Sequence, residues 1–273
     1  MTGRLLFTEA EWNVAILHVV KTMTDYLRPY RTAIYEHKRD EQGSEYGKGW
    51  GSGSYLCLGD RVFILTNQHI ACIRAESRVL GYQFDGQQDI RAVAGNHTEY
   101  PEPLDLAVLP VDMSAWNAIK HKSKAIEAQQ ISLAHDPVPG ELLTFTGFAG
   151  ETVSFHFNTL IAKGTCYTAR EIELPQDKRF SWRFHFGIDY RPDLATSVID
   201  DKGLPLPPGL SGSTVWNTGF VAAKMADVLW SPDMARVTGV IWGWPSGHAC
   251  LVATRAEFLR SFLLGVPTIN AGL

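Results

Sequence analysis

A serine, a histidine and an aspartate stand in sequence surroundings that suit nucleophilic catalysis. Ser211 lies in the frame Gly-Leu-Ser-Gly-Ser, His69 ends a Thr-Asn-Gln-His run, and Asp105 opens the apolar run Asp-Leu-Ala-Val-Leu. A serine hydroxyl is a weak nucleophile at neutral pH and needs an adjacent base to take its proton. An imidazole is suited to that work, and a carboxylate on its other nitrogen would fix the tautomer and stabilise the imidazolium. Together the three residues predict a hydrolase with a Ser–His–Asp triad.

Each of these residues also has an ordinary structural explanation. Ser211 could be a turn serine in a glycine-marked hairpin, His69 could cap a helical turn, and Asp105 could start a strand in an exposed loop. The joint pattern favours catalysis, because apolar strands precede the histidine and follow the aspartate. The other eight histidines have no assigned role and are expected at the surface or in satisfied core positions.

With Gly-Ser-Gly-Ser at 51–54, these segments resemble the trypsin-like (chymotrypsin-fold) serine peptidases, most closely the bacterial HtrA-like branch. The resemblance covers roughly residues 30–265. It implies a mainly all-β fold of two antiparallel β-barrels, with the active site in the cleft between them and the chain order His, Asp, Ser. It also implies that the backbone N–H groups of Gly209 and Ser211 form the oxyanion hole. Because the resemblance covers nearly all of these residues, we do not expect the PDZ module that is usual in the HtrA branch.

The resemblance also outlines a substrate pocket. Its floor is expected at Pro205, next to Leu206, because the family places that position six residues before the serine. One wall is expected at 241–243, and another near Leu251, which would make the pocket shallower. We expect a small or medium apolar residue before the scissile bond. The members of this predicted pocket are Pro205, Leu206, Ile241, Trp242, Gly243 and Leu251.

Two residues depart from the family pattern. Ile241 replaces a serine that hydrogen-bonds the catalytic aspartate, so Asp105 needs another donor. Leu210 stands where zymogen-activated trypsins have an aspartate that pairs with a freed N-terminal amine. We therefore expect no activation of that type. Control is expected from a regulatory protein partner, assembly or loop ordering, including a flipped peptide beside Leu210 in a resting form.

The expected organisation is a single peptidase domain, residues 1–273. It contains a helix at 8–28, an N-terminal barrel at about 30–123, a C-terminal barrel at about 136–254 and a closing helix at 255–264. Thr8 and Glu11 fit a capping box, and apolar residues then recur at helical spacing. This helix is expected to pack on the barrel's own flank, with partner docking as the alternative.

Short strand candidates separated by turn signals favour barrels over βαβ units. Residues 40–49 are predicted to form a loop; a phosphate-binding loop there is rejected, since its spacing is one residue short and Gly49 replaces the Ser or Thr that such a loop requires. Residues 113–130 are predicted to be helical and to connect the barrels. The predicted strands are 31–36, 55–58, 61–65, 77–81, 89–94, 105–111, 141–146, 153–160, 180–188, 214–216, 237–243 and 250–254.

Composition narrows the function classes. The 273 residues are 45% hydrophobic with a net charge of −4, which argues against nucleic-acid binding. The N-terminal apolar stretches are too short for a secretory signal or a membrane span, so the expected location is the cytoplasm. The four cysteines are expected to be reduced and mostly buried, with a bridge between Cys57 and Cys72 as a minor alternative. No cysteine or histidine spacing fits zinc, and neither a metal nor a cofactor is expected.

The leading prediction is thus a serine endopeptidase acting on a protein or peptide substrate through an acyl-enzyme. Two alternatives stay open at this stage. One is a non-catalytic partner-binding module on the same fold. The other is an esterase, because the serine machinery alone does not distinguish esters from peptides.

Overall fold

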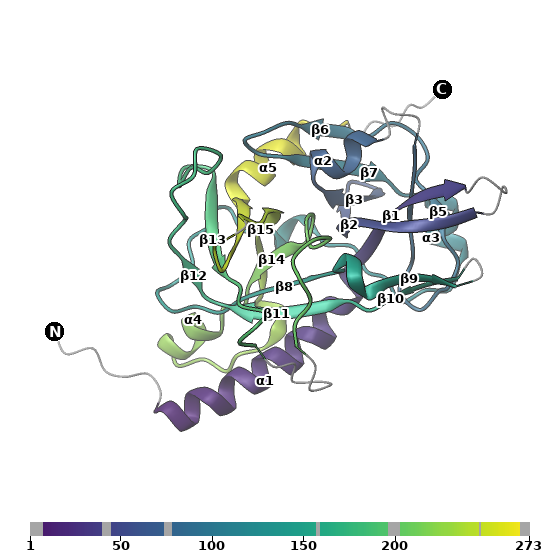
Figure 1. The fold of residues 1–273 in the computed structure, drawn as a ribbon. Helices are drawn as coiled ribbons and strands as arrows, with labels where there is room; N and C mark the ends of the chain where they lie inside the picture. Colours follow the sequence, from purple (N-terminus) through teal and green to yellow (C-terminus); the bar gives the residue numbers. More distant parts are fainter. Residues whose placement is uncertain are drawn as a thin grey trace.

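The structure is a computed structural model that describes residues 8–39, 45–73, 78–156, 159–195, 203–245 and 247–267. As predicted, the fold is mainly β. Two curled antiparallel sheets of seven strands each form half-barrels that pack against each other, with a helix near either end of the chain (Figure 1).

The N-terminal half-barrel has the strand order β5-β4-β1-β2-β3-β7-β6. Its longest strand, β2, pairs with β1 on one edge from Glu45 to Ser54, whereas on the other edge it pairs with β3 from Ser54 to Leu58. The strands are β1 Arg31–Arg39, β2 Glu45–Leu58, β3 Arg61–Thr66, β4 Val79–Tyr82, β5 Arg91–Ala92, β6 Thr98–Tyr100 and β7 Leu106–Pro110.

The C-terminal half-barrel has the order β11-β8-β14-β15-β16-β13-β12, and a separate hairpin, β9–β10, extends beside β2 (Figure 1). The strands are β8 Leu143–Gly147, β9 Val153–His156, β10 Thr159–Ala162, β11 Thr165–Ala169, β12 Glu171–Ile172, β13 His185–Asp189, β14 Thr214–Asn217, β15 Arg236–Gly243 and β16 Cys250–Arg255.

The strands that precede His69 and follow Asp105 are buried on both faces. In β3, Val62 and Ile64 pack inside the N-terminal half-barrel, whereas Phe63 and Leu65 face a second core. Neighbouring β7 alternates in the same way. Because successive side chains in a strand point to opposite faces, two-sided burial produces the continuous apolar runs seen in the sequence.

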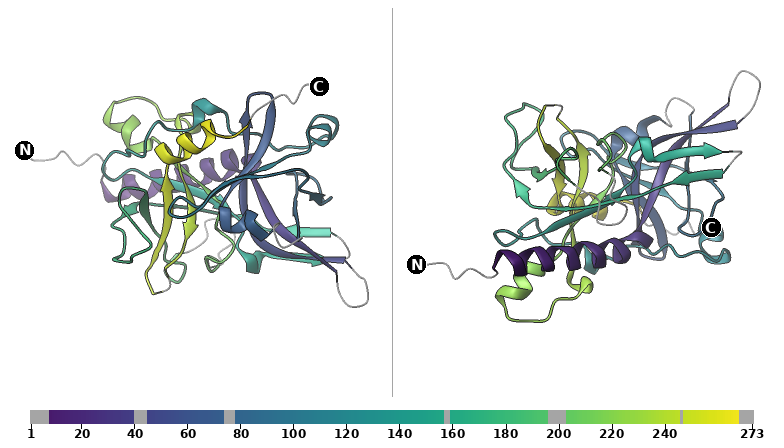
Figure 2. Two further views of the ribbon diagram at one scale, coloured as in Figure 1. Left: turned by 90° about the horizontal axis from the view of Figure 1, so that it is seen from above. Right: turned by 60° about the horizontal axis from the view of Figure 1, so that its bottom comes forward.

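The N-terminal helix α1, Glu9–Leu27, packs on the molecule's own flank. Its capping box at Thr8 and Glu11 is present as predicted. Val19, Met23 and Leu27 are fully buried in the core that also contains Trp216 of β14. Figures 1 and 2 show α1 running along the side of the C-terminal half-barrel, beside α4.

The remaining helices are short. The closing helix α5 packs on β15 and β16, as expected for the predicted C-terminal helix. The segment between β7 and β8 contacts both halves, since Ile126 pairs with Leu56 and Ile131 with Val237. The helices are α2 Gln68–Ala71, α3 Met113–Ala118, α4 Phe220–Met225 and α5 Ala256–Leu264, with 3₁₀ turns at Arg28–Tyr30, Ala128–Gln130, Gly150–Thr152 and Pro232–Met234.

Several local predictions were wrong. The single strand predicted at 153–160 is a hairpin, β9–β10. The predicted loop at 40–49 is replaced from Glu45 onward by β2, because cross-strand pairing with β1 outweighs the low strand propensity of glycine; residues 40–44 lie outside the described residues. Of the strand predicted at 180–188, only the part from His185 onward is a strand, β13. Of the helix predicted at 113–130, only α3 and one 3₁₀ turn are helical.

All four cysteines are free thiols. The expectation that they are mostly buried was wrong, because only Cys250 is buried and the other three are half-buried. Burial raises the pKa of Cys250 to about 11 and also raises that of Cys57 and Cys166, so these thiols stay protonated at neutral pH. No helix in the described ranges is long and apolar enough to cross a bilayer.

Candidate functional site

His69 lies in the short helix α2, immediately after buried strand β3. The preceding Asn67 is fully buried and donates from Nδ2 to the backbone oxygen of Asp105 at 2.8 Å. Sequence reasoning assigned no role to Asn67. Its signal was an amide side chain in the run that leads to the histidine. Its hydrogen bond connects the segment before His69 to the segment that carries Asp105.

His69 and Asp105 form a close pair. His69 Nδ1 lies 2.6 Å from Asp105 Oδ2, and the His69 backbone N–H donates to Oδ1 at 2.9 Å. The aspartate side chain is 3% exposed, whereas the imidazole is 44% exposed. A buried carboxylate that accepts at both oxygens holds the ring in one tautomer, with the proton on Nδ1. The backbone N–H of His69 is also the extra donor that Asp105 was expected to need.

The backbone before Ser211 forms a tight turn. Leu210 N–H donates to Pro207 O at 2.9 Å, and Gly209 has φ +98°. Proline followed by a glycine at positive φ is the pattern of a type II turn. The Pro208 carbonyl accepts from Gly150 N–H at 2.8 Å. Because C=O and N–H point in opposite directions across a trans peptide, the Gly209 N–H is directed away from Gly150.

Two backbone donors at this turn have no acceptor within the described residues. They are the N–H groups of Gly209 and Ser211. By contrast, Gly212 N–H donates to Ile241 O at 2.8 Å, and Ser213 N–H to Leu210 O at 3.1 Å. Unpaired donors on alternate residues of a rigid turn can bind an oxygen that carries negative charge.

Ser52 of β2 connects the turn to the N-terminal half-barrel. Its hydroxyl donates to Gly209 O and accepts from Phe148 N–H, both at 2.8 Å. Its backbone N–H donates to Ser211 O at 2.8 Å. The sequence predicted no role for Ser52 beyond its place in the Gly-Ser-Gly-Ser motif. Its signal was a small polar side chain between two glycines, which allows the turn to approach β2 closely.

The serine segment lies against the segment that leads to His69. A Cβ added to Gly212 would lie 2.4 Å from Thr66 Oγ1 and 2.0 Å from Ser52 O. Thr66 in turn donates to Ser52 O at 2.8 Å. Gly212, which directly follows Ser211, therefore lies against Thr66, which is three residues before His69. Any side chain at position 212 would prevent this contact.

The Ser211 hydroxyl is not bonded to the imidazole. Its hydrogen bond in the described part of the chain is a long one, 3.5 Å to Trp242 O. Serine has one rotatable side-chain bond, and catalytic hydrogen bonds commonly shorten only when substrate binds. The histidine–aspartate half of the predicted arrangement is thus formed, while the serine hydroxyl takes another acceptor.

The residues predicted to form the substrate pocket occupy different environments. Ile241 and Leu251 are 1% exposed and belong to an apolar cluster with Leu210 inside the C-terminal half-barrel. Trp242 is buried and its ring lies 5.5 Å from that of Phe180. At the loop end, Leu206 is 56% exposed, Pro205 O accepts from Tyr190 Oη at 2.6 Å, and Gly243 of β15 is half-buried.

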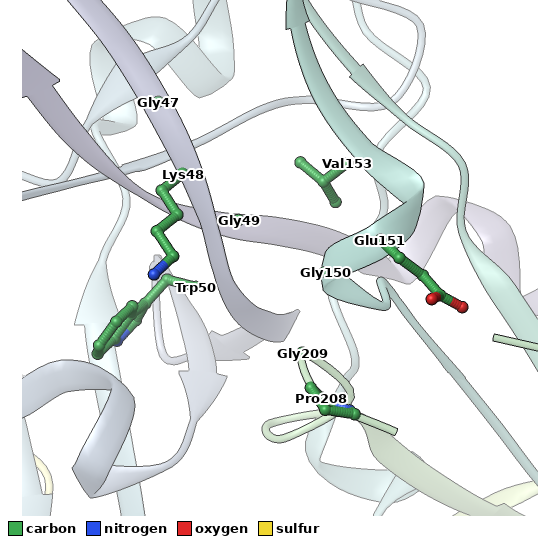
Figure 3. A pocket seen from close by; sticks show the side chains of 9 residues that line it. All are labelled: Gly47, Lys48, Gly49, Trp50, Gly150, Glu151, Val153, Pro208 and Gly209. Atoms are coloured by element: carbon green, nitrogen blue, oxygen red, sulfur yellow. The ribbon is translucent and has the colours of Figure 1, made fainter. Parts of the chain in front are cut away.

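A cavity of about 620 Å³ opens beside Gly209. It is bounded by β2 at 47–50, by the turn at Gly150 and Glu151, and by Pro208 (Figure 3). Lys48 and Trp50 line one side, whereas Glu151 points away from Lys48 (Figure 3). The Glu151 carboxylate accepts from Leu206 N–H at 2.9 Å, which steadies the loop before the serine.

The chain is similar in structure to two proteases. The serine protease domain of the Sesbania mosaic virus polyprotein aligns over 87% of this chain and 94% of its own, with 14% identity and a TM-score of 0.46. The Rv3671c protease from M. tuberculosis, in its active form, aligns over 92% and 87%, with 15% identity and a TM-score of 0.49. At these values neither similarity establishes a function for this chain.

Comparisons by sequence identify no relative. No protein-family model matches the chain, and no curated protein matches it. As for metals, the described residues contain no group of three or more histidine, cysteine, aspartate or glutamate side chains that could hold an ion.

Proposed function

We propose that this chain is a serine endopeptidase in which His69, Asp105 and Ser211 form a catalytic triad. The observation that carries the proposal is the 2.6 Å pair between His69 Nδ1 and Asp105 Oδ2. It joins a half-exposed imidazole to a carboxylate that is almost fully buried. Such an arrangement leaves the other imidazole nitrogen with a lone pair, as a general base requires.

The chemistry follows from these groups. The Ser211 hydroxyl rotates from Trp242 O toward His69 Nε2, gives up its proton there and attacks the substrate carbonyl carbon. Asp105 stabilises the imidazolium, and the N–H groups of Gly209 and Ser211 bind the developing oxyanion. His69 then protonates the leaving amine, which departs and leaves an acyl group on Ser211. Water, activated by the same imidazole, hydrolyses this acyl-enzyme and restores the serine.

Peptides are the proposed substrate class. The part of β2 at 47–50 borders the cavity beside Gly209 and is not paired with β3, which supports its use as a source of main-chain groups for an extended peptide. The proposed pocket for the residue before the scissile bond lies between Pro205, Leu206 and the 242–243 segment. Ile241 and Leu251 are buried in the apolar cluster and bring no charged group to this pocket, which supports a small or medium apolar side chain there.

The same proposal includes activity that is controlled without zymogen cleavage, and a cytoplasmic location. Leu210 is fully buried in an apolar cluster, so packing, in place of an ion pair with a new N-terminus, anchors the turn. We propose that a regulatory protein partner limits activity. Rapid digestion of casein by the purified chain alone would contradict this part. The four motif segments also support a place near the HtrA-like branch.

A fluorophosphonate probe tests the proposed function. It should label the wild-type chain at Ser211, and Ser211→Ala should abolish the labelling without loss of fold. Ser261→Ala on helix α5 is the matched control, because its hydroxyl donates to Glu257 O within the helix. His69→Gln should slow labelling by roughly 10²-fold or more. Its control is His97→Gln, since the His97 ring pairs with the Glu99 carboxylate and not with Asp105.

The bond between Ser211 Oγ and Trp242 O favours one other function, a non-catalytic partner-binding module. That function predicts no labelling of well-folded protein, even with candidate partners present. Labelling followed by cleavage of a peptide library, read by mass spectrometry, would support the endopeptidase. Labelling together with hydrolysis of esters, but without cleavage of peptides, would reject the endopeptidase.

A further inference from the structure

The loop that carries Asp105 belongs to the N-terminal half-barrel, yet the C-terminal half-barrel binds it. The carbonyls of Pro103 and Leu104, the two residues before Asp105, each accept one hydrogen bond from the other half. His185 Nε2 lies 2.7 Å from Pro103 O, and Thr254 Oγ1 donates to Leu104 O at 2.8 Å. Successive carbonyls are thus bound in a region where the two sheets meet.

The two donors are neighbours in their sheet. His185 of β13 and Thr254 of β16 are directly paired across the strands. Both residues are fully buried. Their side chains therefore form one rigid unit, because strand pairing determines their spacing and the core excludes water from their hydrogen bonds.

The tautomer of His185 is set by its second contact. Ser181 N–H donates to His185 Nδ1 at 3.1 Å, so the ring proton lies on Nε2 and points to Pro103 O. The rings of Phe180 and Trp242 lie 6.4 and 5.1 Å from the imidazole and limit its rotation. Burial lowers the pKa of His185, and nearby Arg255 adds to this, which keeps the ring neutral.

The backbone conformation of Asp105 needs such support. Asp105 has φ +48°, a backbone conformation that non-glycine residues adopt rarely. Such a residue keeps this conformation only where surrounding contacts determine it. The Asp105 side chain accepts the 2.9 and 2.6 Å bonds from His69. The two carbonyls just before Asp105 accept the hydrogen bonds from the other half-barrel.

We propose that His185 and Thr254 are positioning residues that hold Asp105 in register with His69 across the two half-barrels. This inference rests on the proposed function, because it explains how the acid of the triad is oriented. The same sheet also carries Ser211, just before β14, and pairs β14 with β15 and β15 with β16. One half-barrel thereby orients both the nucleophile and the partner of its base.

The test compares paired substitutions in the full chain. Thr254→Val keeps the shape but removes the donor, whereas Thr254→Ser keeps the hydroxyl. His185→Phe removes the donor, whereas His185→Gln retains an N–H. The donor-free variants should lower the maximal rate of fluorophosphonate labelling by about 10-fold to 100-fold, with little change in the half-saturating probe concentration. The donor-retaining variants should recover most of that rate.

A second readout does not depend on activity. The proton between His69 Nδ1 and Asp105 Oδ2 should give a low-field proton NMR signal in the wild type, and Thr254→Val should shift or broaden it while Thr254→Ser preserves it. A folded Thr254→Val protein with unchanged labelling rate and unchanged signal would overturn the inference and leave the proposed function intact. A wild type that shows this signal without labelling would refute the proposed function, and the variants would still test the positioning role through the signal.

Discussion

Substituting Gly209 by alanine addresses the oxyanion turn directly. The new Cβ would lie 2.5 Å from Gly150 N and 2.7 Å from Phe148 O, with Ala149 C at 3.1 Å. All three atoms belong to the backbone, so no side chain can move aside. The residue would also keep a φ of +98°, which side-chain-bearing residues rarely adopt.

The expected magnitude follows from these distances. An ordinary contact is at least 3.4 Å, so the turn must shift by about 0.9 Å to relieve the closest approach. An oxyanion donor works within a window of only about 0.4 Å, from roughly 2.7 to 3.1 Å. We therefore expect Gly209 N–H to leave that window, which lowers the catalytic rate by about 10²- to 10³-fold, or ~3 kcal/mol. The unfavourable φ should lower the free energy of unfolding by a further ~1–2 kcal/mol.

The assay is the rate of fluorophosphonate labelling and of peptide cleavage, with thermal unfolding measured alongside. Gly203→Ala is the control, because a Cβ on Gly203 meets nothing within 4 Å. It should leave both the rate and the Tm close to those of the wild type. A folded Gly209→Ala protein with wild-type labelling would refute the proposed role of this N–H.

Three further predictions concern the support of the site and the packing of α1. Ser52→Ala leaves Gly209 O and Phe148 N–H without their partner, and should slow labelling about 10-fold and cost about 1–3 kcal/mol of unfolding free energy, measured by urea denaturation. Because burial lowers the pKa of His185 below 6.5, the unfolded chain binds its proton first as pH falls, and stability is lost below about pH 6.5. The Tm of His185→Gln should therefore fall less than that of the wild type between about pH 7.5 and pH 5, and an equal fall would contradict a neutral ring in the folded state. Met23→Ala in α1 should lower the free energy of unfolding by about 2–5 kcal/mol, whereas Leu17→Ala, at a half-exposed position, should lower it by less than about 0.5 kcal/mol. Equal losses for the two variants would show that the helix does not pack as described.

The chemistry-bearing residues were readable from the chain because their signals are local. A strand buried on both faces gives an unbroken apolar run, and such runs stand before His69 and after Asp105. The capping box and the helical spacing of apolar residues predicted the helix α1. By contrast, β2 was underestimated, because its glycines weaken the strand pattern while their lack of side chains permits contacts that stabilise it. A Cβ on Gly53, for example, would lie 2.4 Å from Ile64.

The supporting residues were not readable in the same way. A fully buried polar residue within an apolar strand, such as His185 or Thr254, signals a partner without saying which. The partners of these two lie 82 and 150 residues away, in the other half-barrel. Asn67 and Ser52 likewise act on backbone groups of distant segments. Nothing in their immediate sequence specifies those groups.

The sequence by itself determined the mainly β architecture, the helices near both ends and the three residue types that can do the chemistry. These depend on side-chain periodicity, turn residues and functional groups, which act over a few positions. Only the tertiary structure decided the 2.6 Å pair between His69 and Asp105, the direction of the Gly209 N–H and the present acceptor of the Ser211 hydroxyl. Those features depend on how two half-barrels pack, because a hydrogen bond forms or fails over less than an ångström.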